Sequence, residues 1–393
     1  MSTQKSFLSL PLILITLGHL AVDLGQGAVP VLLPFIKELF FLSYTEVGII
    51  VMVQNFTSSV IQPLFGYAID KVYWPFLLPL SIFIAALGMS LTGFAPSYYG
   101  LLIIVVIAGL GSASFHPQGA VAINHISKFG SRGKSMGLFS VGGNLGFALG
   151  SLFMVFLLAK IPGGLTNTIY FAIPGIIVSA LIIVHLKELS PAIKKEKTTA
   201  NEAEITTKKI PWRMLTILLA FIFVRSTIHT SLQTYIPLYY INYLKEDPVY
   251  ASYLVSLFLL GGACGTFVGA SMSDKYGRKL VIVTSMLLSL PLLLIFPYVP
   301  TIPALLLIFL SGGALVSSFA TTLILAQEMM PGNIGVASGL TVGFSLGLGG
   351  IGTTILGMVA DRFDLPTVLF ILGVLPVFGL LLALQLPGQK SRT

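Results

Sequence analysis

Charge is scarce in this chain, and its scarcity excludes a soluble fold. Asp, Glu, Lys and Arg together make up 9% of the 393 residues, while hydrophobic residues make up 55%. The mean hydropathy is +0.95. A soluble domain carries about 25% charged residues, so these residues could not cover a surface exposed to water. The composition therefore predicts a membrane protein.

The sequence also has only one cysteine and no phosphate-binding nucleotide motif. Cys264 is the only cysteine, so the chain forms no internal disulfide and no cysteine metal site. No Gly-x-x-x-x-Gly-Lys-Ser/Thr sequence is present, which argues against an ATP-driven pump. A membrane enzyme acting on lipid-linked substrates would need catalytic acids, histidines or metal ligands gathered near one interface, and none are visible. The short termini argue against a receptor with a signalling extension. We expect no enzyme, no cofactor and no metal.

Twelve apolar stretches are long enough to cross a bilayer as helices, in two groups of six. The first contains His19 and Asp23 and is too long for a signal-peptide core, so we expect it to be retained. The stretches are 9–36, 45–69, 76–94, 97–124, 136–159, 167–187, 213–242, 250–273, 280–298, 301–325, 335–358 and 365–386. The sequence predicts an all-α membrane protein of twelve transmembrane helices.

The basic residues predict the orientation of this bundle. With the amino terminus inside, seventeen Lys and Arg residues fall in inside segments and four in outside loops, the asymmetry of the positive-inside rule. We expect a multi-pass protein of the cell (inner) membrane with both termini in the cytoplasm. The net charge of +8 comes from these loops, so we expect no nucleic-acid partner.

Two features recur about two hundred residues apart and divide the chain into halves. Asp70-Lys71 follows one apolar stretch, and the charged run 274–279 follows another. Residues 141–146 recur as 342–347 in the same order. The polar segment 188–212 is expected to be a cytoplasmic linker between an N-terminal half, 1–187, and a C-terminal half, 213–393. A duplicated membrane bundle of this kind is typical of a transporter.

The two charged loops resemble the loop signature of the major facilitator superfamily. The copy at 270–279 is the fuller one, although Ala270 replaces the usual glycine, and the copy at 66–71 lacks the Gly-Arg part. The resemblance implies two pseudo-symmetric six-helix bundles. It also implies that acids in these loops lie against helix starts and close the cytoplasmic side. The expected gating residues are Asp70, Lys71, Asp274, Lys275, Arg278 and Glu328.

At a finer level the chain resembles bacterial fosmidomycin-resistance efflux proteins. The matching segments are His19 to Asp23, Gln62-Pro63, Phe115-His116-Pro117, 141–144, and much of 326–361. One position departs from the family pattern. An acid is expected after Phe-His-Pro, and this chain has Gln118. If that acid carries protons in relatives, this protein must use another group or a different coupling.

Ionisable side chains inside the apolar stretches are the candidate site. An ionised carboxylate at mid-membrane costs about 2.5 to 3.5 kcal/mol on insertion scales, so such groups are functional by default. Asp23 shares a helical face with His19 and Gln26, and Arg225 shares one with His229 and Gln233. The superfamily arrangement places these two helices across a central cavity, which makes an Asp23–Arg225 pair plausible. The alternative is that the two charges only neutralise one another and fix packing.

We predict that Asp23 and His19 couple transport to protons. His116, beside Pro117, is either a structural donor at a helix break or a member of a proton relay. The predicted substrate-binding residues are Arg225, His229, Gln26, Gln233, Asn144, His116 and Gln118.

These features together predict a secondary transporter that works by alternating access and is driven by an ion gradient. The favoured activity is proton-coupled efflux of a small polar or amphipathic compound. The alternative is uptake or exchange of an organic anion bound by Arg225. The expected partners are a small-molecule substrate, a proton or other coupling ion, and the lipid bilayer, with the chain acting as a monomer.

Overall fold

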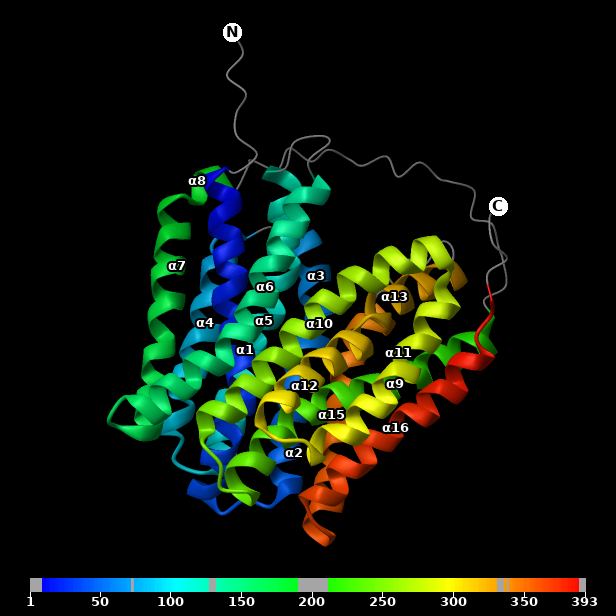
Figure 1. Ribbon diagram of the computed structural model, residues 1–393. Coiled ribbons are helices and arrows are strands. Elements are labelled where there is room, and N and C mark those ends of the chain that lie inside the picture. The colour runs from blue at the N-terminus through cyan, green and yellow to red at the C-terminus, as the bar shows by residue number, and fades with distance from the viewer. Residues whose placement is uncertain are drawn as a thin grey trace, which may run out of the picture. The chain divides into compact units, whose positions relative to one another are not determined.

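All regular elements that we describe are helices (Figure 1). The computed structural model describes residues 9–71, 74–126, 132–189, 211–330, 336–337 and 339–388. A membrane-spanning segment must satisfy its own backbone N–H and C=O groups, which a helix does internally. The predicted all-α membrane fold is confirmed.

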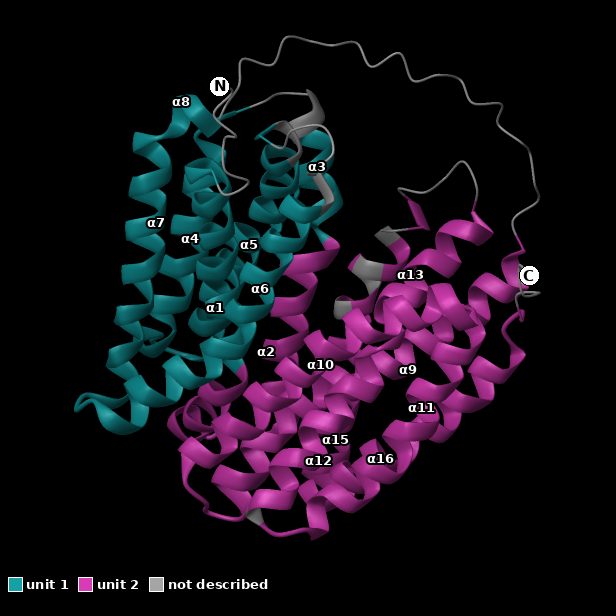
Figure 2. Ribbon diagram, turned by 45° about the horizontal axis from the view of Figure 1, so that its top comes forward, with its two compact units in different colours: residues 1–29, 61–200 teal, residues 30–60, 201–393 magenta. Residues whose placement is uncertain are grey.

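Two compact units make up the chain, and their boundary does not fall at one point in the sequence (Figure 2). Unit 1 contains residues 1–29 and 61–200, and unit 2 contains 30–60 and 201–393. The first break falls between Val29 and Pro30, inside the first helix. The division into an N-terminal half, 1–187, and a C-terminal half, 213–393, stays a prediction. Most of the predicted linker, residues 190–210, lies outside the described residues.

Unit 1 is a bundle of helices that begins with the first part of α1 (Leu10–Phe40). Its other helices are α3 (Gln62–Lys71), α4 (Leu77–Leu91), η2 (Thr92–Phe94), α5 (Tyr98–Ile126), α6 (Arg132–Val155), η3 (Phe156–Lys160), η4 (Gly164–Phe171), α7 (Ala172–Val184) and α8 (Leu186–Leu189).

Unit 2 contains the end of α1 and the helices α2 (Tyr44–Asn55) and η1 (Phe56–Val60), together with the helices of the C-terminal region. These are α9 (Trp212–Pro237), η5 (Leu238–Tyr243), α10 (Pro248–Tyr276), α11 (Arg278–Ile295), η6 (Phe296–Tyr298), α12 (Thr301–Val316), α13 (Ser318–Met329), η7 (Gly339–Gly343), α15 (Phe344–Arg362) and α16 (Leu365–Gln385).

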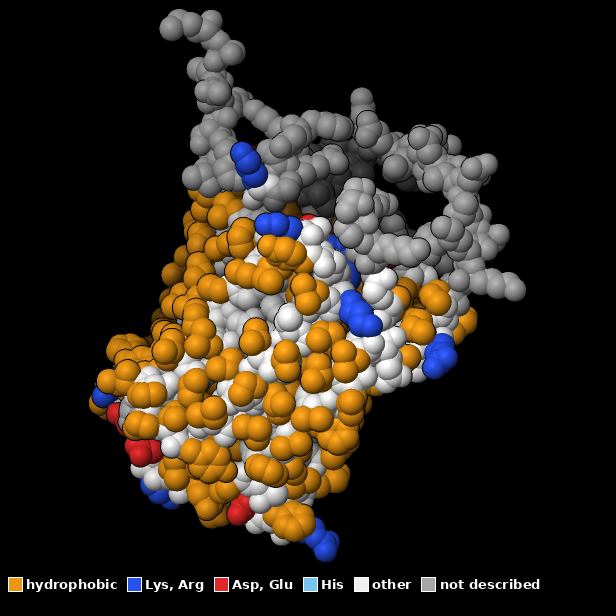
Figure 3. All heavy atoms as spheres, turned by 45° about the vertical axis from the view of Figure 1, so that its right-hand side comes forward, with side chains coloured by type: hydrophobic (Ala, Val, Ile, Leu, Met, Phe, Trp, Pro, Cys, Tyr) orange, Lys and Arg blue, Asp and Glu red, His pale blue; other side chains and the backbone are white. Residues whose placement is uncertain are grey.

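Eleven helical segments among the described residues are long and apolar enough to cross a membrane. Each end lies within four residues of the end of a predicted stretch. The largest differences are at Phe40 and Met329, where the helical segments continue past the predicted ends at 36 and 325. The twelfth predicted stretch, 335–358, overlaps α15 but includes residues outside the described part of the chain. Hydrophobic side chains cover most of the face shown in Figure 3, and charged ones lie toward its edges.

Glycines spaced four residues apart let helices meet at backbone distance within each unit. In unit 1, Gly142, Gly146 and Gly150 of α6 face α1. A Cβ on these glycines would lie 2.5, 2.5 and 2.3 Å from the carbonyl oxygens of Thr16, Leu20 and Leu24. Lipid gives no hydrophobic drive for helix association, so small residues that permit close approach hold such helices together. This contact fixes α6 against the face of α1 that carries His19 and Asp23.

Candidate functional site

A buried polar cluster in unit 1 gathers around the Asp23 carboxylate. Asp23, on α1, is 3% exposed. Its Oδ2 lies 3.1 Å from His19 Nε2 and its Oδ1 lies 3.6 Å from His116 Nε2, which comes from α5. Gln26 donates from Nε2 to Asp23 Oδ1 at 3.3 Å and to Ser112 Oγ at 2.6 Å. Ser112 Oγ also lies 3.1 Å from His116 Nε2. The cluster therefore joins two helices through one carboxylate.

His19 lies between two hydrogen-bond acceptors, the Phe139 carbonyl oxygen and the Asp23 carboxylate. His19 Nδ1 lies 2.7 Å from the carbonyl oxygen of Phe139, on α6. A carbonyl oxygen only accepts, so Nδ1 carries the hydrogen. In a neutral ring Nε2 would then be a bare lone pair facing Asp23 Oδ2 at 3.1 Å. Two acceptors do not attract at that distance, whereas a proton on the imidazole or on the carboxyl group would turn this contact into a hydrogen bond.

Close packing holds the His19 ring in this position. The ring stacks on Phe139, with centroids 4.0 Å apart and planes at 28°. Gly143, also on α6, leaves no room for a side chain, since a Cβ there would lie 2.5 Å from His19 Nε2 and 2.7 Å from Asp23 Oδ2. The backbone of α6 thus forms one wall of the cluster.

Two other predicted residues of unit 1 lie apart from these contacts. Gln118 is buried but donates from Nε2 to the carbonyl of Ser114 in its own helix at 2.7 Å. Asn144 is exposed on α6. The structure gives no role to either in the Asp23 cluster, and their part in substrate binding stays a prediction.

His19, Asp23 and His116 are also residue types that bind metals. Each offers one ligand atom, and the three atoms lie within 4.8 Å of one another. The same atoms take part in the hydrogen bonds of the cluster. A metal ion bound there would therefore replace these contacts.

Unit 2 holds a second buried charge, Arg225 on α9, which is 3% exposed. Its guanidinium donates to Thr322 Oγ1 on α13 at 3.0 Å and to Ser345 Oγ on α15 at 3.3 Å. It also lies over the ring of Phe319, 5.1 Å from the centroid. Within the described residues of unit 2, no carboxylate pairs with it. Since Asp23 belongs to the other unit, the expected Asp23–Arg225 pair stays a prediction.

His229 and Gln233 lie on the next turns of α9. Gln233 Nε2 lies 3.0 Å from His229 Nδ1, and the histidine ring packs 5.3 Å from that of Phe258. Both partners of this hydrogen bond are thus on α9. The two residues share a helical face with Arg225, as their spacing predicts.

Four of the six predicted gating residues, Asp274, Lys275, Arg278 and Glu328, have described side chains. Asp274, at the end of α10, pairs with Arg278, whose NH2 lies 3.3 Å from Glu328 Oε1 on α13. Lys275 lies over the ring of Tyr276. Gly277, between α10 and α11, has a φ of 92°, which favours glycine. The side chains of Asp70 and Lys71 lie outside the described part of the structure.

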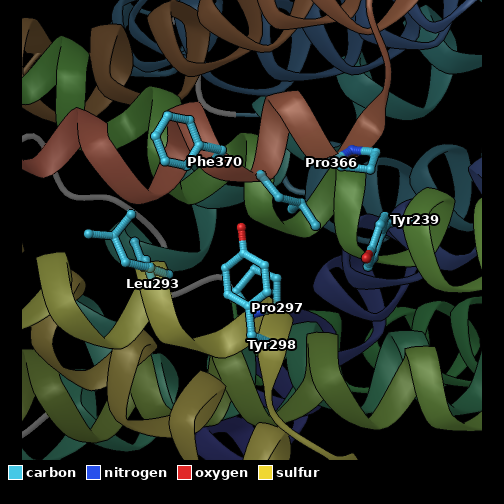
Figure 4. Close-up of a pocket in the computed structure, with 8 residues that line it drawn as sticks. Tyr239, Leu293, Pro297, Tyr298, Pro366 and Phe370 are labelled. Carbon is cyan, nitrogen blue, oxygen red and sulfur yellow. The ribbon is translucent and has the colours of Figure 1, made fainter.

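A small pocket in unit 2 contains none of the predicted residues. Figure 4 shows its aromatic and proline walls, drawn from η5, from α11 and η6, and from α16. It is lined by Tyr239, Leu293, Leu294, Pro297, Tyr298, Pro366, Leu369 and Phe370. Its lining has no charged side chain.

The chain belongs to the Major Facilitator Superfamily, whose model matches residues 15–351 and 241–392. Members of this family are membrane transporters and not enzymes. The sequence is 34% identical to the "Uncharacterized MFS-type transporter YfnC" of Bacillus subtilis (strain 168), over 97% of this chain and 94% of that protein. It is 32% identical to the "Fosmidomycin resistance protein" of Escherichia coli (strain K12), over 96% of this chain and 93% of that protein.

Solved structures of transporters share the fold. A bacterial homologue of the human lysosomal transporter Spinster gives a TM-score of 0.77 at 16% identity and covers 95% of both chains. The nucleoside transporter NupG gives 0.72 at 16% identity, covering 96% of this chain and 98% of that one. The xylose transporter XylE from E. coli gives 0.73 at 15% identity, covering 97% of both. These likenesses establish the fold alone.

Proposed function

We propose that this transporter exports a small polar or amphipathic compound in exchange for protons, and that Asp23 and His19 hold the coupling proton. The supporting observation is the 3.1 Å contact between His19 Nε2 and Asp23 Oδ2, which a proton on either group would turn into a hydrogen bond, since His19 Nδ1 already lies against the Phe139 carbonyl oxygen. His116 and Gln26 hold the other carboxylate oxygen. The positive-inside distribution of basic loops supports a cell-membrane protein with both termini in the cytoplasm.

The physical basis of this coupling is the cost of a buried charge. With both histidines neutral, the cluster carries the negative charge of Asp23, and one proton brings it to zero. A net charge away from water is unfavourable. A state that shields the cluster therefore favours the protonated form, and a state that opens it to water on the other side allows release. A proton gradient can then drive the change between the two states.

The E. coli relative's name supplies a first probe, fosmidomycin. We would screen purified protein by thermal shift against fosmidomycin and a panel of metabolites and antibiotics. Each stabilising compound would then be tested in proteoliposomes with and without an imposed pH gradient. We expect the gradient to drive net transport and an uncoupler to stop it. Net transport that is the same with and without the gradient would contradict proton coupling.

A second candidate function, uptake or exchange of an organic anion, is favoured by the surroundings of Arg225. This buried cation has only hydroxyl hydrogen-bond partners among the described residues of unit 2, Thr322 and Ser345. An anionic substrate group would supply the missing counter-charge. Counterflow of an anion that persists without a proton gradient would support this candidate over the first.

A further inference from the structure

Segment 30–60 precedes the linker by more than a hundred residues, yet it packs in unit 2 with residues 201–393. One contact between the two sequence regions lies at the start of α2. The Asp361 carboxylate, at the end of α15, accepts hydrogen bonds from the backbone N–H groups of Tyr44 at 2.7 Å and Thr45 at 2.9 Å. Thr45 Oγ1 donates to the same carboxylate at 2.6 Å.

These bonds complete the capping of α2. The first N–H groups of a helix have no partner within it. The N-cap residue Ser43 accepts from Glu46 N at 3.1 Å, and Glu46 bonds back to Ser43 N, so a capping box satisfies the third position. The first two positions, Tyr44 and Thr45, depend on Asp361. A carboxylate there is also attracted to the positive end of the helix dipole.

A second polar contact and a glycine seam lie along the same junction. Glu38 Oε1, near the end of α1, accepts from Asn242 Nδ2 at 2.7 Å and lies 3.9 Å from Lys245 Nζ. Below the cap, α2 and α15 meet at backbone distance: a Cβ on Gly48 would lie 2.7 Å from Thr354 Cα. Exposed hydrogen bonds thus hold the rim of the junction, and close glycine packing holds the helices below it. Gly48 has no side chain that would interdigitate with α15 and resist separation.

We propose that Asp361 and the first turn of α2 form a latch. This latch holds the transporter closed on the side of the membrane where α2 begins and α15 ends. Lys245 lies just before the start of α10, and Asp274 lies near its other end, about 39 Å along the helix from Pro248. The latch therefore belongs to the opposite side from the charged loop 274–279. Alternating access opens each side in turn, so the bonds to Asp361 must break once in every cycle. Water can replace Asp361 as the partner of the freed N–H groups, which makes the latch reversible.

A labelling experiment on purified protein in nanodiscs tests the latch without a substrate. The reporter is Thr354→Cys, placed at the glycine seam, where Thr354 is 8% exposed. It is introduced with Cys264→Ala, since Cys264 is exposed. The latch variant is Asp361→Asn. Asp364→Asn is the matched control, because it removes the same charge three residues away, where Asp364 accepts from Thr367 N at 2.8 Å and caps its own helix, α16.

We expect Asp361→Asn to raise the maleimide labelling rate about twofold to fivefold, the population change that an exposed carboxylate at a helix N-terminus supplies. Asp364→Asn should label at the reference rate. Thr45→Val removes only the hydrogen bond from the hydroxyl group to Asp361, so it should raise the labelling rate by a smaller factor. This variant tests the latch if Asp361→Asn does not fold. An unchanged rate in the folded latch variants, or an equal rise in Asp364→Asn, would overturn the latch. Neither result bears on the coupling proton, since the assay contains no gradient.

Discussion

Gly143→Ala is the substitution that should separate proton coupling from folding most clearly. A Cβ at this position would lie 2.5 Å from His19 Nε2 and 2.7 Å from Asp23 Oδ2. Both distances are well below van der Waals contact, so the imidazole and the carboxylate must move. Their 3.1 Å contact is then lost or lengthened. The added methyl group therefore clashes with His19 Nε2 and Asp23 Oδ2, the two atoms that we propose share the coupling proton.

The expected loss of folding free energy in Gly143→Ala is small enough for the protein to fold. The expected loss of hydrogen-bond energy is large enough to impair proton coupling. Overpacking costs about 1 to 3 kcal/mol, while replacing glycine by alanine in a helix returns about 1 kcal/mol. The net loss of stability is therefore about 0 to 2 kcal/mol. A hydrogen bond to a charged group contributes about 1.5 to 3 kcal/mol. Losing the bond that stabilises the protonated pair should move the pH of half-maximal gradient-driven transport downward by about one to two units.

The assay is the pH profile of gradient-driven transport in proteoliposomes, with two other glycines of α6 as controls. Gly137→Ala should behave as wild type, because nothing lies within 4 Å of its added Cβ. Gly146→Ala should lower the unfolding temperature, because its Cβ would lie 2.5 Å from the carbonyl oxygen of Leu20, which cannot rotate away. An unshifted pH profile in folded Gly143→Ala protein would refute the proposed role of the His19–Asp23 contact.

Two further predictions concern unit 2 and the charged loops. Arg225→Lys keeps the charge but loses the fork that reaches both Thr322 and Ser345, so affinity should fall most for anionic substrates in a binding titration. Equal affinity of wild type and Arg225→Ala for every anion tested would rule out an anion clamp. Asp274→Asn removes one of the two acidic partners of Arg278, the other being Glu328. Asp274→Asn and Asp70→Asn should each speed thiol labelling of a cysteine introduced on the cytoplasmic side of the cavity in a Cys264→Ala background. Labelling at the wild-type rate in both folded variants would mean that these acids serve only the structure of their loops.

Local periodicity explains what the sequence could predict about the Asp23 cluster. His19, Asp23 and Gln26 lie three and four residues apart, which places them on one face of any helix, and Asp23 contacts both of the others. His116 stands out in the sequence because it precedes a proline inside an apolar stretch. That position carries no information on its distance from Asp23, which depends on how α1 and α5 pack.

Tertiary packing explains what the sequence could not predict. His19 Nδ1 lies 2.7 Å from the carbonyl oxygen of Phe139, and a backbone acceptor has no sequence signal. Gln118 stands where the resemblance leads one to expect an acid, but its side chain bonds within its own helix. Asp361 lies in the region that matches the family, yet its partners are 316 and 317 residues away. No spacing rule joins residues at that separation.

The most direct test of the account is to compare exchange with gradient-driven transport in wild-type and Asp23→Asn protein. Both are measured in the same proteoliposomes, with a substrate taken from the thermal-shift screen. We predict that the variant binds substrate and exchanges it across the membrane but no longer responds to an imposed pH gradient, because an amide in place of the carboxylate cannot take up the proton. Full gradient-driven transport by Asp23→Asn would contradict the claim that this carboxylate couples transport to protons.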